Sequence, residues 1–95
     1  MPASAAEVFD LDRPWCLDDR VAVRPEPFGA LLYHFGTRRL SFLKNATVLT
    51  VVQSLAEHPT ARSACTAAGV GGHALPAYQQ ALATLAQSQM IRERA

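Results

Sequence analysis

A predicted β-hairpin places the strongest constraint on how this chain folds. The runs Gly29–Phe35 and Arg38–Leu43 are rich in β-favouring residues, and Gly36-Thr37 separates them. A two-residue loop that begins with glycine suits a type II′ turn, whose twist matches that of two antiparallel strands. Such a turn fixes the register of the hairpin. Three pairs then face each other across the strands: Phe35 with Arg38, Tyr33 with Leu40, and Leu31 with Phe42.

The register also divides the hairpin side chains between two faces, because a strand alternates its side chains. The first face carries large apolar and aromatic residues, namely Leu31, Tyr33, Phe35, Leu40 and Phe42. The second face is mixed, with Ala30, Leu32, His34, Arg39, Ser41 and Leu43. Because the first face is the more apolar, we expect helices to cover it and Leu40 and Phe42 to belong to the core. Ser41 and Leu43 then point the other way, where they can lie beneath a bound peptide.

The rest of the chain predicts one more strand and three helices. Alternation predicts a short strand over residues 20–24, and helical spacing predicts helices over about 45–57, 60–68 and 76–90. Asn45 is a typical N-cap residue, Gly69 a typical C-terminal glycine, and Pro76 a typical first helical residue. The predicted fold class is therefore α+β, in the order β-β-β-α-α-α, with three helices packed on a small antiparallel sheet.

The length of 95 residues is enough for one domain. We expect residues 1–12, which are rich in alanine and serine, to form a flexible tail, and residues 13–95 to form the domain. The N-terminus lacks the basic start and apolar core of a secretory signal, and no apolar run approaches the roughly 20 residues of a membrane helix. The sequence thus predicts a cytoplasmic protein that has no membrane partner.

The residues that carry chemistry in enzymes form no recognisable set here. We find no acid pair, no Ser-His-Asp set, no phosphate-binding glycine loop and no metal cluster, and therefore expect no catalytic residue, metal or cofactor. Cys16 and Cys65 are far apart and are expected to be buried thiols. The three histidines are expected on the surface or in turns. Between residues 27 and 91, four bases and one acid leave a charge of 4 − 1 = +3, enough to attract a mildly acidic peptide.

Two segments resemble a known family. Asp12-Arg13-Pro14-Trp15-Cys16-Leu17 and the run Arg24–Lys44, with its Pro25-Glu26-Pro27-Phe28-Gly29 start, look like the mycofactocin-system peptide chaperones of the MftB family. The resemblance continues through residues 51–56 and 58–62 into the last predicted helix, and covers about residues 12–91. The central run of more than twenty residues makes this resemblance specific.

The resemblance implies a PqqD-like RiPP recognition element, a module that recognises ribosomally made, modified peptides. Such modules have a winged-helix-like fold and no catalytic residues. They hold the leader of a precursor peptide as an extra strand beside their third strand, against their third helix, and support its modification by a partner radical-SAM maturase. Here those elements would be Arg38–Leu43 and Leu75–Met90. The expected peptide-binding residues are Arg38, Arg39, Leu40, Ser41, Phe42, Leu43, Tyr78, Leu82 and Leu85.

Two other functions remain open on the sequence. A DNA-binding winged helix is the first. Leu75–Ile91 carries four glutamines but no lysine or arginine, so this helix lacks the basic side chains that contact DNA phosphates. We therefore expect no nucleic-acid partner. A homodimeric scaffold that pairs two copies through the same strand edge is the second. Arg38 and Arg39 also have a second interpretation, as charges that guard an edge strand against aggregation.

Overall fold

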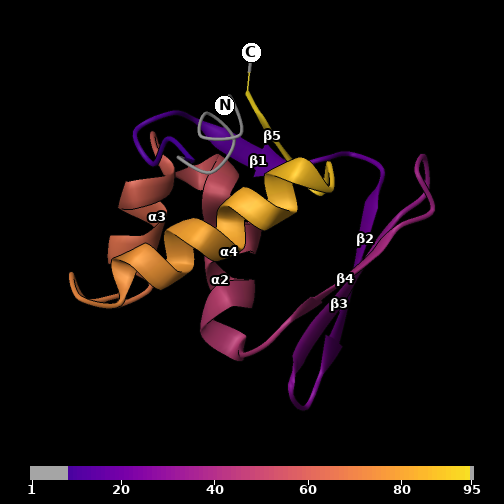
Figure 1. Cartoon of the computed structure of the whole chain (residues 1–95), viewed down its shortest axis with the longest axis horizontal. Helices are drawn as coiled ribbons and strands as arrows, with labels where there is room; N and C mark the ends of the chain where they lie inside the picture. Colours follow the sequence, from indigo (N-terminus) through magenta and orange to yellow (C-terminus); the bar gives the residue numbers. More distant parts are fainter. Residues whose placement is uncertain (1–8, 95) are drawn as a thin grey trace, which may run out of the picture.

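The computed structural model describes residues 9–94, which form an α+β fold (Figure 1). The elements, in chain order, are β1 Trp15–Leu17, β2 Val21–Glu26, β3 Gly29–His34, β4 Leu40–Leu43, α2 Ala46–Ser54, the 3₁₀ helix η1 Leu55–Glu57, α3 Ala61–Ala67, α4 Leu75–Gln87 and β5 Ile91–Glu93. The predicted order of three strands followed by three helices is confirmed, as β2-β3-β4 and then α2, α3 and α4. The strands β1 and β5 are additional to that prediction.

The three-stranded sheet has the order β2-β3-β4, and both neighbouring pairs are antiparallel. The predicted hairpin register is confirmed, because Tyr33 pairs with Leu40 and Leu31 with Phe42. The loop is not as predicted, since β3 ends at His34 before the expected last pair is reached.

The loop between β3 and β4 spans residues 35–39 rather than the two residues Gly36-Thr37. Arg38 has the positive φ (64°), whereas a type II′ turn requires it at Gly36. The His34 imidazole explains the difference, because its Nδ1 accepts hydrogen bonds from the backbone N–H groups of Gly36 (2.9 Å) and Thr37 (3.0 Å). A Cβ at Gly36 would lie 2.8 Å from His34 Cε1, so glycine is needed there for room.

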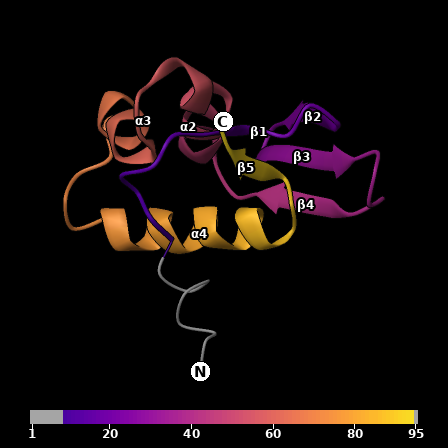
Figure 2. The same ribbon diagram turned by 90° about the horizontal axis from the view of Figure 1, so that it is seen from above.

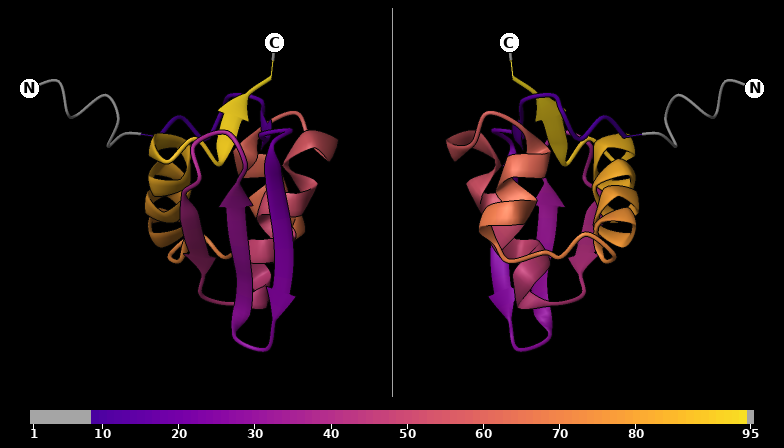
Figure 3. Two further views of the ribbon diagram at one scale, coloured as in Figure 1. Left: turned by 90° about the vertical axis from the view of Figure 1, so that its right-hand side faces the viewer. Right: turned by 90° about the vertical axis from the view of Figure 1, so that its left-hand side faces the viewer.

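The sheet buries the face opposite to the one predicted as core. Ala30, Leu32 and His34 are fully buried and Leu43 is nearly so, and they form the inner face beneath the helices. Leu40 and Phe42 lie on the outer face, where they expose 60% and 67% of their surface. The left view in Figure 3 shows β2, β3 and β4 in front of the described helices, with the outer face uncovered. The prediction that Leu40 and Phe42 belong to the core is therefore wrong.

The position of α2 explains which face is covered. Alternation groups residues by face, but it does not say which face receives the helices. Because α2 begins three residues after Leu43, it folds back on the side to which Leu43 points. The small Ala30 leaves room for this helix, whose valines Val48, Val51 and Val52 are all buried.

The helices begin close to the predicted positions. The Asn45 side chain caps α2 by accepting a hydrogen bond from the Val48 N–H at 2.9 Å, and Thr60 caps α3 in the same way. Gly69 follows α3 with a φ of 88°, as predicted for its C-terminal end. α4 begins one residue before Pro76, and its C-terminal end lies next to the end of β4 (Figure 2).

β1 and β5 form a separate two-stranded antiparallel sheet. Cys16 of β1 pairs with Arg92 of β5, so the sheet joins the two ends of the domain. Three-residue strands are too short to show an alternating pattern, which is why the sequence did not reveal them. α4 consequently ends at Gln87, short of the predicted Met90, because the chain must turn into β5.

The described part of the predicted tail packs on the domain. Phe9 and Leu11 are buried, and the Phe9 ring stacks on Trp15 with the ring centroids 4.4 Å apart. Residues 1–8 lie outside the described residues, and the division of the chain at residue 12 stays a prediction. None of the described helices is both long enough and apolar enough to cross a membrane.

Candidate functional site

β4 is an edge strand, and its hydrogen-bonding pattern shows which backbone groups are unused. The His34 N–H donates to the Arg39 carbonyl at 3.0 Å, so this pair is hydrogen-bonded. Bonded and non-bonded pairs alternate along an antiparallel ladder. Given the register, Ser41 and Leu43 therefore bond to β3, whereas Leu40 and Phe42 turn their N–H and C=O groups to the open edge. Among the described residues nothing pairs with that edge.

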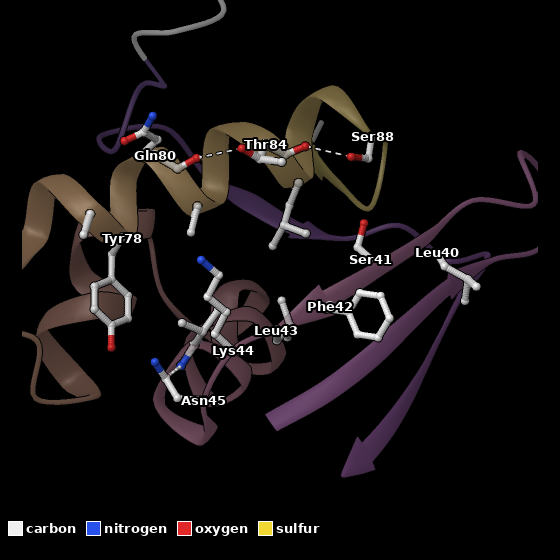
Figure 4. Close-up of a pocket in the computed structure, with 14 residues that line it drawn as sticks. Leu40, Ser41, Phe42, Leu43, Lys44, Asn45, Tyr78, Gln80, Thr84 and Ser88 are labelled. Carbon is white, nitrogen blue, oxygen red and sulfur yellow. Dashed lines mark hydrogen bonds between the residues drawn. The ribbon is translucent and has the colours of Figure 1, made fainter. Parts of the chain in front are cut away.

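This pattern shows which groups of Ser41 a bound peptide could contact. Its backbone N–H is directed at Leu32 of β3, inside the sheet, and only its side chain is turned toward α4 (Figure 4). The backbone positions that an added strand can use are Leu40 and Phe42. Sequence reasoning missed this assignment because it depends on where the loop ends, and the His34 side chain sets that loop.

The opposite edge of the sheet, on β2, is largely closed. The Phe35 N–H donates to the Arg20 carbonyl at 2.8 Å, so by the same alternation Val21, Val23 and Pro25 turn their backbones outward. Pro25 has no N–H, and the Val21 N–H already donates to the Asp18 carbonyl at 3.0 Å. Only Val23 keeps a free N–H on this edge within the described residues.

A groove of about 780 Å³ lies between β4 and α4 (Figure 4). Residues of β4, the start of α2 and one side of α4 line it: Leu40, Ser41, Phe42, Leu43, Lys44, Asn45, Val48, Ala77, Tyr78, Gln80, Ala81, Thr84, Leu85 and Ser88. The groove follows the open edge of β4, so a chain lying in it would meet the unused backbone groups.

The α4 wall of the groove offers few polar donors. The Thr84 hydroxyl donates to the Gln80 carbonyl at 3.2 Å, and the Ser88 hydroxyl donates to the Thr84 carbonyl at 2.8 Å. Both hydroxyl protons are therefore used within the helix, and Ala77 and Ala81 leave the space between these residues open. The wall suits apolar side chains better than polar ones.

Lys44 is the one charged residue that lines the groove. It has no ion-pair partner among the described residues, and Figure 4 shows its side chain reaching from the end of β4 toward α4. The groove thus has a positive end, beside Asn45 and Tyr78, and no acidic lining residue.

The structure brings together six of the nine residues predicted to bind peptide: Leu40, Ser41, Phe42, Leu43, Tyr78 and Leu85 all line the groove. Leu82 does not line it and is 1% exposed in the core. Arg38 and Arg39 lie in the exposed loop before β4, outside the groove. A role of any of these residues in peptide binding stays a prediction.

The remaining lining residues were missed by sequence reasoning, although a signal for some of them exists. Ala77, Ala81, Thr84 and Ser88 recur at helical spacing and so occupy one side of α4. They are small or polar, and sequence reasoning followed only the large apolar residues of this helix.

A polar cluster supports the loop that leads into β4. His34 is buried, contrary to its predicted place on the surface or in a turn, and its Nε2 lies 3.7 Å from Asp18 Oδ1. Asp18 accepts hydrogen bonds from the backbone N–H of Arg20 (2.9 Å) and from its Nε (3.2 Å), and these bonds hold the pKa of Asp18 below its ordinary value. The cluster orients the loop and hence the start of the open edge.

The cysteines are buried and free, as predicted. Burial raises the pKa of the Cys65 thiol, which makes it a poor nucleophile at neutral pH. The described residues contain no group of three or more His, Cys, Asp or Glu side chains that could hold a metal ion.

An open strand edge beside an apolar groove is the geometry with which proteins of many folds bind an extended peptide. The sequence profile of the peptide chaperone MftB family matches residues 14–92. This chain therefore belongs to the peptide chaperone MftB family.

Three curated relatives are named "Peptide chaperone MftB". The protein from Mycobacterium ulcerans is 63% identical over 94% of this chain and 82% of its own length. The protein from Mycobacterium tuberculosis is 62% identical over 90% of this chain and 79% of its own length. That from Mycolicibacterium smegmatis is 64% identical over 87% and 81%. No solved structure gave a significant match to this chain.

Proposed function

We propose that this chain is a non-catalytic peptide chaperone that binds the leader of the mycofactocin precursor peptide as an added strand on β4. The bound leader would lie in the groove against α4, and the complex would present the precursor to a radical-SAM maturase in the cytoplasm. The single observation that carries the proposed binding mode is the open β4 edge, whose unused backbone groups at Leu40 and Phe42 border the groove.

The energetics of strand addition fit a reversible complex. Two N–H and two C=O groups can make four backbone hydrogen bonds, each worth about 1 kcal/mol net. One or two apolar side chains buried in the groove add about 1.5–3 kcal/mol each. Association itself costs at least about 4 kcal/mol, so the net affinity is modest. Modest affinity suits a chaperone that must pass its peptide on.

The family description supports the proposal that the chain binds a peptide, and the groove supports the proposal that the peptide lies beside β4. The closed β2 edge adds a second argument, because it leaves β4 as the one side of this sheet that is ready to accept a strand within the described residues. An added strand on β4 would extend the sheet over α4 and cover the groove.

Isothermal titration of the precursor peptide, whole and leader-truncated, tests this function. We expect the whole peptide to bind and the truncated one to lose most of its affinity. Replacing Phe42 with proline removes an outward N–H, and replacing it with alanine keeps that N–H, so the pair isolates the backbone contribution. We expect Phe42→Pro to bind about fivefold or more weakly than Phe42→Ala, as the loss of about 1 kcal/mol implies.

Equal affinities for Phe42→Pro and Phe42→Ala, with both variants folded by circular dichroism, would contradict strand addition on β4. Equal affinities for the whole and truncated peptides would instead place the bound segment outside the leader.

A further inference from the structure

Both sides of the open β4 edge are apolar, which is unusual for an edge strand facing water. On the outer side, Leu40 and Phe42 are largely exposed, and Phe28 stands beside Phe42 with the ring centroids 6.2 Å apart. On the inner side, Leu43 and Leu85 are almost fully buried and form part of the apolar lining of the groove, together with Ala77 and Ala81. A strand that binds here is therefore met by apolar surface on both of its faces.

The backbone pattern says where each side chain of an added strand would go. In a peptide that runs antiparallel to β4, the residues that bond to Leu40 and Phe42 lie directly opposite them, and directly opposite residues share one face of the sheet. Their side chains would rest on the outer face, beside Leu40 and Phe42. The residue between them, opposite Ser41, would turn its side chain into the groove toward α4.

This placement defines the chemistry of the three peptide residues. The two outer ones cover Leu40 and Phe42, which gains most from apolar side chains. The middle one faces a wall in which the Thr84 and Ser88 hydroxyl protons are already used within α4 and in which Leu85 and Ala81 are apolar. An apolar side chain therefore fits this position better than a polar one. A strand that packs on only one face needs apolar residues at every second position, but this edge favours them at three successive positions.

Charge complementarity adds a fourth feature. Lys44 follows the last residue of β4 and is the one charged residue lining the groove, without an ion-pair partner among the described residues. A peptide carboxylate close to the end of the apolar stretch can pair with it. In a peptide that runs antiparallel to β4, this acidic residue comes before the apolar stretch in the peptide sequence.

We propose that the β4 edge selects an extended peptide segment with three successive apolar residues and a carboxylate within two positions of them, which pairs with Lys44. This inference rests on the proposed function, because it assumes that a peptide adds to β4. It goes further by naming the kind of segment that is bound and the residues that read it: Leu40 and Phe42 outside, Leu43 and Leu85 inside, and Lys44 at the end.

Selection from a random nine-residue peptide library displayed on phage tests the inference, because the library offers every order of apolar, polar and acidic residues. With the wild-type chain we expect enrichment of three successive apolar residues and a neighbouring Asp or Glu. With Lys44→Glu the apolar triplet should persist and the acid should disappear. With Phe42→Ser the outer positions should accept polar residues, while the middle position stays apolar.

The outcomes separate this inference from the proposed function. If Phe42→Pro selects the same peptides as the wild type, the edge is not used and both proposals fail. If the selected peptides depend on the edge but alternate apolar and polar residues, or keep their acid with Lys44→Glu, only this inference fails. Failure of the wild type to enrich any peptide contradicts this inference, whereas the proposed function is then decided by the titration with the precursor peptide.

A synthetic peptide of the selected sequence gives the quantitative test. Replacing its two outer apolar residues with serine should weaken binding at least about tenfold for the wild type, but less than threefold for a chain carrying both Leu40→Ser and Phe42→Ser. Sedimentation of the unliganded chain tests whether a second copy of the chain, rather than a peptide, occupies the β4 edge. A wild-type dimer that Phe42→Pro converts to monomer would assign the edge to a second copy and overturn the inference.

Discussion

The two edges of the three-stranded sheet differ in how many free backbone groups they offer to an added strand. On β2, Pro25 lacks an N–H and the Val21 N–H is already bonded to Asp18, so only Val23 remains free within the described residues. On β4, Leu40 and Phe42 both keep outward backbone groups and border a groove. The difference teaches that an open edge is a local property, set by single residues, and that this chain leaves one edge open while closing the other.

The largest effect should come from moving proline by one residue along β4. Ser41→Pro removes an N–H that bonds to Leu32 inside the sheet and leaves a buried carbonyl unpaired, so we expect a loss of about 1–3 kcal/mol in the free energy of unfolding. Phe42→Pro removes an N–H from the open edge and should cost less than half as much. Guanidinium unfolding of both variants measures this. If Phe42→Pro were the more damaging of the two, the assignment of the open edge would be reversed.

A smaller effect is expected from opening the β2 edge. Pro25→Val restores an outward N–H there, and the free energy of unfolding should change by no more than about 1 kcal/mol. The new edge should promote self-association, which sedimentation at rising concentration detects. Pro27→Val, in the turn after β2, is the matched control and should remain as the wild type. Peptide affinity should be unchanged in Pro25→Val, and a twofold or greater rise would mean that both edges bind peptide.

The smallest effect concerns pH and the anchoring of the closed edge. The Arg20 N–H and guanidinium hold the pKa of Asp18 below its ordinary value. A carboxyl with a lowered pKa in the folded state stabilises the fold above its unfolded pKa, about 3.9. That contribution is lost as the pH falls through the lower folded pKa. The unfolding midpoint of the wild type should therefore fall more steeply below about pH 4 than that of Asp18→Asn.

Asp12→Asn provides the matched control for that measurement. The pKa of Asp12 is also lowered, chiefly by its hydrogen bond with Arg62, but its side chain is 66% exposed whereas that of Asp18 is 10% exposed. Water screens the exposed pair, so Asp12→Asn should alter the pH dependence less. If both variants changed the pH dependence of the unfolding midpoint equally, the Asp18 carboxylate would contribute no more to stability than the exposed Asp12 carboxylate.

The hairpin shows how much of the fold could be predicted from the sequence. Its register was predicted from a two-residue turn, and the pairs Tyr33 with Leu40 and Leu31 with Phe42 are as predicted although the turn itself is different. The loop did not follow, because the buried His34 ring binds two backbone N–H groups and lengthens it. The covered face did not follow either, because side-chain size suggested the face of Leu40 and Phe42.

The candidate site shows a similar division. The resemblance pointed to the third strand of the predicted sheet and the last helix, and most of the expected residues line the groove between them. Leu82 does not, because helical spacing alone cannot separate the part of an apolar stripe that enters the core from the part beside it. Lys44 entered the sequence analysis only as one of the four bases between residues 27 and 91. Its place as the one charged residue that lines the groove depends on the tertiary structure.

The sequence by itself determined the three strands β2, β3 and β4 and the three helices, their order, the pairing of β3 with β4 and the caps of α2 and α3. These features depend on interactions between near neighbours in the chain. Only the tertiary structure decided which sheet face is buried, which backbone groups of β4 stay unpaired, and that β1 and β5 join the two ends of the domain. Those features depend on contacts between distant residues, which local patterns do not encode.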